Sequence, residues 1–307
     1  MAVSARTSPS RAAAGPQSAD VRGEFVDVGG RRLRIVRAGP AEAGPLIVLE
    51  HGAFGCAADW AVVQHRLAAL GRRSLAYDRA GLGFSDPGPR PRDGRAIAAD
   101  LASLLRALDE RGPVVLVGHS MGGLMVRLFA LTHPDRALGV VLVDAVTPDL
   151  MQVRGGPAMV RAFWRLLRLT RALARAGLMR PVSLATHNLI GLSGSARAEK
   201  RRIHGSAAHA HWAAEEVAAW PQTSGQAAES EFPPDLPVAV ITAGAERARP
   251  TLKALQALPA LASRHGYVEH VAGARHASLL GERFADPIVR GIEQVLAARP
   301  AARSRSA

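Results

Sequence analysis

The residues best suited to chemistry lie in the segment 114–123, which reads VVLVGHSMGG. Its four aliphatic residues predict a buried strand, and a segment of helical period follows the glycines. The pattern Gly-x-Ser-x-Gly between them predicts a tight turn that holds the Ser120 hydroxyl clear of the backbone, in front of a helix N-terminus. This context favours a nucleophilic serine over the alternative, a structural glycine-rich turn.

A serine nucleophile needs a histidine as general base, and usually a carboxylate to orient that histidine. Among 11 histidines, His276 fits best, because it lies in the small-residue loop VAGARHAS ahead of the last predicted helix. His119 is expected to point to the other side of the turn as a packed core residue. The trio His204, His209 and His211 does not make a convincing zinc site, so no metal and no cofactor are expected.

An acyl transfer site also needs donors for the developing oxyanion. A predicted strand at 45–50 runs directly into the turn His51-Gly52-Ala53. The N–H of Ala53, paired with the N–H of Met121, would complete an oxyanion hole, and losing one such donor typically costs about 10² to 10³ in rate. The alternative is a glycine turn with a capping histidine.

The elements that position these residues follow from the hydrophobic pattern. Short runs of Val, Ile and Leu alternate with segments of helical period, which is typical of a mostly parallel sheet covered by helices. The predicted strands are 32–36, 45–50, 74–77, 113–117, 139–143, 237–242 and 267–271, and the predicted helices are 57–70, 95–110, 121–133, 250–263 and 286–298. Between 147 and 232 no convincing strand is found, which indicates a helical insertion between two strands of one sheet.

Four motifs together make the chain resemble the α/β-hydrolase superfamily, over residues 23–146 and 233–298. They are His51-Gly52, YDRAGLGFSD at 77–86, GHSMG at 118–122 and GARH at 273–276. The resemblance implies an eight-stranded, mostly parallel sheet with helices on both faces, a Ser-His-acid triad, and an α-helical cap at 147–232 between strands six and seven. The bacterial esterases and lipases are the most similar group. Because a serine stands at 120, epoxide hydrolase and haloalkane dehalogenase chemistry, which needs a carboxylate nucleophile, is not implied.

The third member of the triad has two candidates. The commonest family pattern places an aspartate shortly after strand seven, but here Arg247 takes that place and Glu246 comes one residue early. Other members place the acid at the end of strand six, where this chain has Asp144. Asp144 is the first candidate and Glu246 the alternative.

The net charge of +13 is concentrated in three stretches: the expected disordered tails 1–22 and 299–307, and the segment 150–198, which holds eight arginines and no Asp or Glu. Residues 159–176 predict an amphipathic helix. Five arginines fall within an arc of about 120° on that helix: Arg161, Arg165, Arg168, Arg171 and Arg175. The opposite, apolar side is expected to cover the active site. The arginines are either solvated or in contact with a membrane surface or an anionic substrate, and nucleic acid is not expected without a recognition motif.

Cys56 is the only cysteine, which excludes an intrachain disulfide. The first 20 residues lack the apolar run of a signal peptide, and no run approaches the ~18 to 20 apolar residues of a membrane span. We therefore expect a cytoplasmic, cofactor-independent serine hydrolase that cleaves a small-molecule carboxylic ester. Cleavage of an amide, a lactone or a C–C bond, or perhydrolysis, would use the same triad, and a non-catalytic ligand-binding protein of this fold is the alternative from another class.

Overall fold

The computed structural model describes residues 22–179, 188–245, 247 and 250–298, and its framework is one eight-stranded sheet in the order β1-β2-β4-β3-β5-β6-β7-β8. Its strands are β1 (Glu24–Asp27), β2 (Arg32–Ala38), β3 (Ile47–Glu50), β4 (Ser74–Tyr77), β5 (Val114–His119), β6 (Ala137–Val143), β7 (Val238–Ala243) and β8 (Gly266–Val271). β2 pairs antiparallel with β1 and β4, and all other neighbours are parallel. The hydrophobic pattern missed β1, because this four-residue edge strand buries none of its side chains fully.

The register of the central strands brings three turns together. Glu50 of β3 lies opposite Gly118 of β5, and His119 of β5 lies opposite Val143 of β6. Because these strands are parallel, the residues that follow them emerge at the same edge of the sheet. The turns after β3, β5 and β6 are those that carry Ala53, Ser120 and Asp144.

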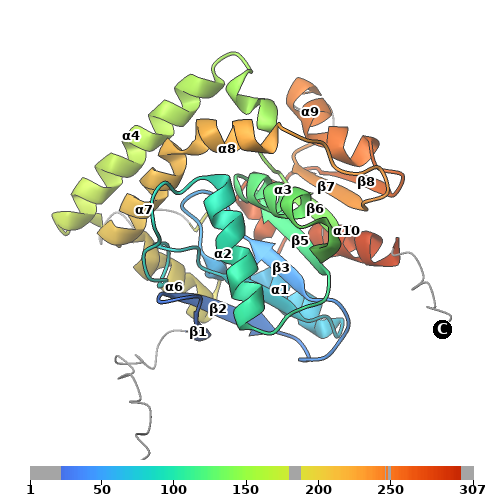
Figure 1. Ribbon diagram of the computed structural model, residues 1–307. Coiled ribbons are helices and arrows are strands. Elements are labelled where there is room, and N and C mark those ends of the chain that lie inside the picture. Colours follow the sequence, from blue (N-terminus) through green and yellow to red (C-terminus); the bar gives the residue numbers. More distant parts are fainter. Residues whose placement is uncertain (1–21, 180–187, 246, 248–249, 299–307) are drawn as a thin grey trace, which may run out of the picture.

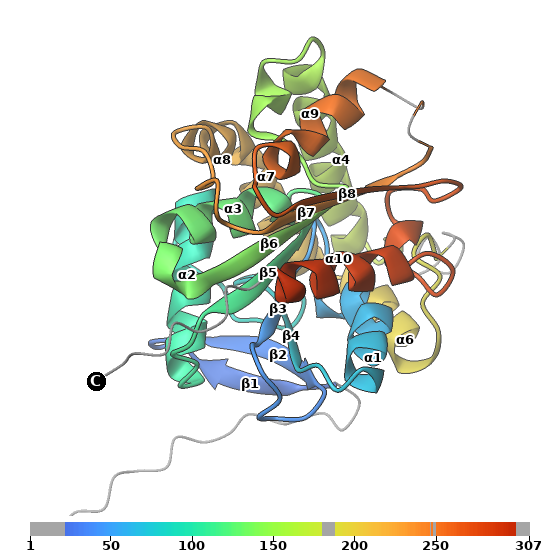
Figure 2. The same ribbon diagram turned by 90° about the vertical axis from the view of Figure 1, so that its right-hand side faces the viewer.

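Helices cover both faces of the sheet, as Figures 1 and 2 show. The helices that flank the sheet are α1 (Ala61–Ala69), α2 (Gly94–Ala107), α3 (Gly122–Thr132), α9 (Pro250–Leu261) and α10 (Asp286–Ala297). One buried cluster lies between the sheet and the helices α2 and α3, and a second lies between the opposite face and the helices α1 and α10. Alternate residues of each central strand therefore enter different clusters, as a sheet that is buried on both faces requires.

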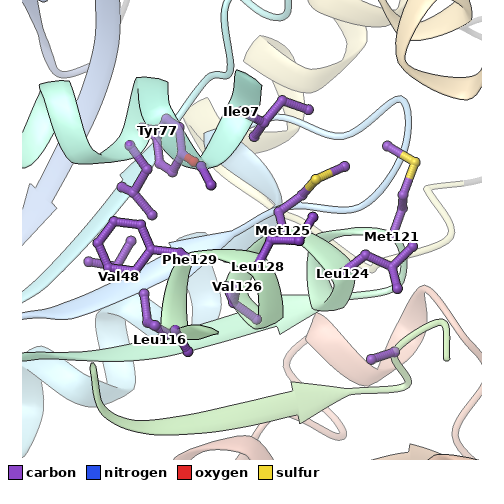
Figure 3. Packing of buried hydrophobic residues seen from close by; sticks show 14 of the residues in the cluster. Val48, Tyr77, Ile97, Leu116, Met121, Leu124, Met125, Val126, Leu128 and Phe129 are labelled. Carbon is purple, nitrogen blue, oxygen red and sulfur yellow. The ribbon is translucent and has the colours of Figure 1, made fainter. Parts of the chain in front are cut away.

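The packing of α3 fixes the helix that follows Ser120. Its residues are buried almost all round, from Gly122 to Ala130. Figure 3 shows Phe129 of α3 close to Val48 and Leu116, which belong to β3 and β5. A helix buried on this scale cannot shift without losing core contacts, so the position of its N-terminus is fixed as well.

Between β6 and β7 the described residues form helices and no strand, namely α4 (Gly156–Arg175), α6 (Gly194–His204), α7 (Ala207–Ala218) and α8 (Trp220–Ala227). We call these four helices the helical insertion. α4 packs along α7 (Figure 1). Among the described residues, no helix combines the length and the hydrophobicity needed to cross a bilayer.

The side chains on the apolar side of α4 differ in their exposure. Leu167 is buried and Phe163 is partly buried, but Leu166 and Leu169 are each 55% exposed. Phe163 and Leu166 line the cavity that also holds Ser120, which agrees with the expected position of this apolar side over the active site. Contact of α4 with a membrane surface stays a prediction.

Candidate active site

Ser120 sits on a strained turn between β5 and α3. Its φ of 54° lies in the left-handed region, which non-glycine residues rarely adopt. Its backbone N–H donates to the carbonyl of Val143 at 3.1 Å, and its carbonyl accepts from Gly123 and Val146 at 3.0 Å each. These bonds tie the strained serine to the adjacent end of β6.

The two glycines of the motif make this turn possible. A Cβ at Gly118 would lie 2.6 Å from the carbonyl oxygen of Gly122, and a Cβ at Gly122 would lie 2.6 Å from the carbonyl oxygen of Glu50. Both distances are far inside van der Waals contact. The spacing Gly-x-Ser-x-Gly is therefore a packing requirement of strand, turn and helix.

His276 and Asp144 form a hydrogen-bonded pair in the same region. Nδ1 of His276 donates to Oδ2 of Asp144 at 2.6 Å. The other carboxylate oxygen accepts from the backbone N–H of Ala243 at 3.2 Å and from Nε2 of Gln256 at 3.4 Å. Burial alone would raise the pKa of Asp144, but the hydrogen bond and charge of His276 outweigh it, and the pKa lies below its ordinary value. Asp144 is therefore an anion that can orient and stabilise an imidazolium.

The structure thus brings Asp144, the first of the two candidate acids, into direct contact with His276. The alternative acid, Glu246, lies outside the described residues. His119 packs beneath the pair: its ring centroid is 4.6 Å from that of His276, and its Nε2 lies 3.1 Å from the His276 carbonyl oxygen. Burial lowers the pKa of His119 to about 3, so it is neutral at pH 7.

The turn after β3 lies directly against the serine. A Cβ at Gly52 would lie 3.0 Å from the Cβ of Ser120, a close contact that a glycine at this position avoids. Within the described ranges, the N–H groups of Ala53 and Met121 donate no hydrogen bond to the protein. Two unpaired backbone donors beside a serine hydroxyl are the arrangement that an oxyanion requires.

Arg79, in the loop that follows β4, holds this turn in place. It is buried, and it donates to the carbonyl oxygens of His51 at 2.6 Å and Gly52 at 3.1 Å. It also pairs with Glu50 at 2.5 Å and with Glu216 of α7 at 2.7 Å. Burial by itself would lower the pKa of Arg79, but the two carboxylates raise it, so this residue remains a cation. It links the helical insertion to the turn that carries Ala53.

These groups open into one cavity of about 510 Å³, whose wall includes both Ser120 and His276. Ala53 lies in the same wall. The apolar part of the lining is Phe54, Phe163, Leu166, Met179, Leu189, Ile190, Ala277 and Leu280. Among the described residues, no group of three His, Cys, Asp or Glu side chains has the geometry to hold a metal ion.

A family model described as the alpha/beta hydrolase fold matches residues 45–282. The chain belongs to this family. A non-heme chloroperoxidase of Streptomyces lividans is 39% identical to this α/β-hydrolase-fold protein over 120 residues, which is 39% of the chain and 43% of the relative. The mouse sn-1-specific diacylglycerol lipase ABHD11 is 39% identical over 101 residues, covering 33% of the chain and 32% of the relative. The chain thus spans less than half the length of these curated relatives.

The solved structures agree on the fold. An esterase from Thermogutta terrifontis, described with malate bound, superposes with a TM-score of 0.65 at 20% identity, over 91% of this chain and all of that one. The putative α/β hydrolase ALR0039 of Nostoc superposes with a TM-score of 0.69 at 20% identity, over 89% of this chain and 97% of that one. Each superposition covers about nine-tenths of this chain, so the shared fold extends beyond the residues that the family model matches.

Sequence reasoning on this α/β-hydrolase-fold protein missed an aromatic cluster at the cavity. Phe54, with a φ of 55°, packs against the rings of His204 and His209, each with its centroid 4.6 Å away, and the two histidine centroids lie 5.9 Å from each other. His209 is buried, and its Nδ1 accepts from the backbone N–H of Gly83 at 3.0 Å. The sequence placed both histidines in the insertion without a role. No local signal shows that they meet a turn 150 residues earlier, because the contact depends on how the insertion folds back.

Proposed function

We propose that the protein is a serine hydrolase that cleaves a carboxylic ester through an acyl-enzyme, with Ser120, His276 and Asp144 as the triad. The observation that carries this proposal is the 2.6 Å hydrogen bond between His276 and Asp144, at a cavity whose wall also presents the strained Ser120. A neutral serine is a weak nucleophile, and an oriented imidazole is what activates it.

In the first half-reaction, Oγ of Ser120 attacks the acyl carbon while Nε2 of His276 takes the serine proton. The carbonyl oxygen becomes an oxyanion, which the N–H groups of Ala53 and Met121 bind. Asp144, anionic and bonded to Nδ1, fixes the tautomer and stabilises the imidazolium. His276 then protonates the departing alkoxide, so an alcohol leaves and the acyl group stays on Ser120.

In the second half-reaction, His276 takes a proton from water, and the resulting hydroxide attacks the acyl carbon. The oxyanion forms again at the same two N–H groups. Its collapse releases the carboxylic acid and returns the proton to Ser120. The mostly apolar lining of the cavity suits a substrate with a hydrocarbon portion.

Perhydrolysis is the second candidate, and the similarity to a protein named as a non-heme chloroperoxidase favours it. In that reaction hydrogen peroxide replaces water and attacks the acyl-enzyme. The products are a peracid and free Ser120. Peracid formation from acetate and hydrogen peroxide, compared with ester hydrolysis by the same preparation, separates the two activities.

A panel of 4-nitrophenyl esters of increasing chain length tests the proposal. We expect turnover by the wild type and a loss of at least about 10⁴-fold in kcat for Ser120→Ala, since the nucleophile is removed. The matched control is Ser103→Ala, a half-buried serine on α2 whose hydroxyl bonds only within its own helix. Equal turnover by Ser120→Ala and Ser103→Ala would refute the proposed nucleophile, and no turnover of any ester by the wild type would refute the esterase assignment.

A further inference from the structure

One wall of the active-site cavity is a basic face of helix α6. Four residues of this helix line the cavity, at the spacing i, i+3, i+4 and i+7 that places side chains on one face: Arg197, Lys200, Arg201 and His204. We call these four residues the basic wall. Much of the apolar lining comes from α4 and from Leu189 and Ile190. The cavity wall therefore combines basic side chains from one helix with apolar side chains from other segments.

The basic wall is fixed in orientation by buried ion pairs on the other side of α6. Glu199 points into the core, where its Oε1 lies 2.7 Å from Nη2 of Arg34. Both side chains are almost wholly buried. Breaking such a pair is costly, so α6 cannot rotate to withdraw its basic face from the cavity.

The charges of the basic wall are not all compensated. Lys200 forms an ion pair with Asp59, which also lines the cavity. The guanidinium groups of Arg197 and Arg201, by contrast, have no carboxylate partner among the described residues. In the sequence, residues 180–187, RPVSLATH, contain no Asp or Glu. Two adjacent turns of one helix thus present unpaired cations to the cavity that holds Ser120.

We propose that the substrate is an ester with an anionic group, a carboxylate or a phosphate, which Arg197 and Arg201 bind while the hydrocarbon portion lies against α4. This inference rests on the proposed esterase function and specifies its substrate class. Arg197 and Arg201 are specificity-determining residues, because they contact a part of the substrate remote from the scissile bond. Planar guanidinium groups suit such anions, which they bind through paired N–H donors.

The test compares esters that differ only in a terminal charge. Mono-4-nitrophenyl adipate and suberate carry a carboxylate at the end of the acyl chain, and 4-nitrophenyl hexanoate and octanoate are their neutral counterparts. A mono-ester of a phosphorylated hydroxyhexanoate distinguishes phosphate from carboxylate. For the wild type at low ionic strength we expect kcat/KM to favour one anionic ester about tenfold, the order that two partly solvent-screened charge pairs supply.

Variants assign that preference to the basic wall. In Arg197→Gln/Arg201→Gln the ratio of kcat/KM for the anionic ester to kcat/KM for its neutral counterpart should fall to about one. The matched control is Arg202→Gln on the same helix, whose guanidinium lies over the Phe84 ring, 5.5 Å from its centroid, and does not line the cavity. In 0.5 M salt the wild-type preference should shrink several-fold, because the Debye length falls to a few ångströms.

The outcomes separate this inference from the proposed function. Turnover of neutral esters without a preference for anionic ones, or a preference that survives in the double variant, overturns the inference and leaves the esterase proposal standing. If no ester is hydrolysed, calorimetric binding of monomethyl adipate to Ser120→Ala decides the inference alone. Binding that Arg197→Gln/Arg201→Gln weakens several-fold supports it, and no binding, or binding unchanged by those substitutions, contradicts it.

Discussion

Asp144 accepts a 2.6 Å hydrogen bond from Nδ1 of His276, although the two residues are 132 positions apart. Asp144 follows β6 and His276 follows β8, and the parallel pairing through β7 brings these chain ends together. The φ of Asp144, 40°, places it in the left-handed region. A strained acid and a strained serine, Asp144 and Ser120, thus lie at two neighbouring strand ends on one edge of the sheet.

Asp144→Asn should lower kcat by about 10³-fold to 10⁴-fold, because an amide in its place favours the wrong imidazole tautomer. Glu246→Gln is the comparison, since Glu246 is the other acid that the sequence offers. We expect near-normal kcat for that variant, measured with the best 4-nitrophenyl ester. The opposite pattern would move the orienting role from Asp144 to Glu246.

Gly122→Ala should abolish activity and destabilise the fold, because its Cβ would lie 2.6 Å and 2.7 Å from the carbonyl oxygens of Glu50 and His51. To relieve these close contacts, α3 would have to move away from the turn that carries Ala53. Gly225→Ala in α8 is the control, since a Cβ there meets no atom within 4 Å. That variant should be as active as the wild type and more stable by about 0.5 to 1 kcal/mol in urea denaturation. Equal behaviour of the two variants would contradict the packing argument.

Arg79→Met should lower the free energy of unfolding by about 3 to 5 kcal/mol, since it leaves Glu50 and Glu216 buried without their cation. Arg32→Met, which breaks an exposed ion pair with Asp86, should lower the free energy of unfolding by at most about 1 kcal/mol. Urea denaturation of both variants measures the difference. Adding Glu216→Gln to Arg79→Met should recover part of the lost free energy of unfolding. If Arg79→Met and Arg32→Met lowered the free energy of unfolding equally, Arg79 would not be the residue that links α7 to the turn after β3.

Stability should fall as the pH drops below about 6.5. Burial lowers the pKa of His209 to about 3, so between about pH 3 and 6.5 the unfolded chain binds a proton that the folded protein does not. Unfolding is therefore favoured by acid, and stability rises with pH over this range. Between pH 7 and pH 5.5 the free energy of unfolding of His209→Gln should fall by about 1 kcal/mol less than that of the wild type.

The measurement for His209 is urea denaturation at both pH values, with His265→Gln as the control. His265 is exposed, so its environment differs little between the folded and unfolded states. A wild type whose stability does not change between pH 7 and pH 5.5 would contradict a neutral, buried His209.

The sequence predicted the elements whose signals are local. Buried parallel strands read as continuous aliphatic runs, and Gly118 and Gly122 mark a turn that only glycine permits, so seven strands and the Ser120 turn were foreseeable. β1 was not, because an exposed edge strand has no hydrophobic pattern. The contacts of Arg79 were not foreseeable either, because its partner Glu216 is 137 residues away. That contact depends on how the helical insertion packs. The choice between Asp144 and Glu246 likewise needed the positions of two strand ends relative to His276.

The central claim, that Ser120 is a nucleophile activated by His276, is tested most directly by covalent labelling. The protein is incubated with a fluorophosphonate, and the adduct is located by mass spectrometry of its peptides. We predict one adduct, on Ser120, that forms rapidly in the wild type and at least about 10³-fold more slowly in His276→Gln, which lacks the general base. Labelling of another residue, no labelling of the wild type, or equal rates in both proteins would contradict the account.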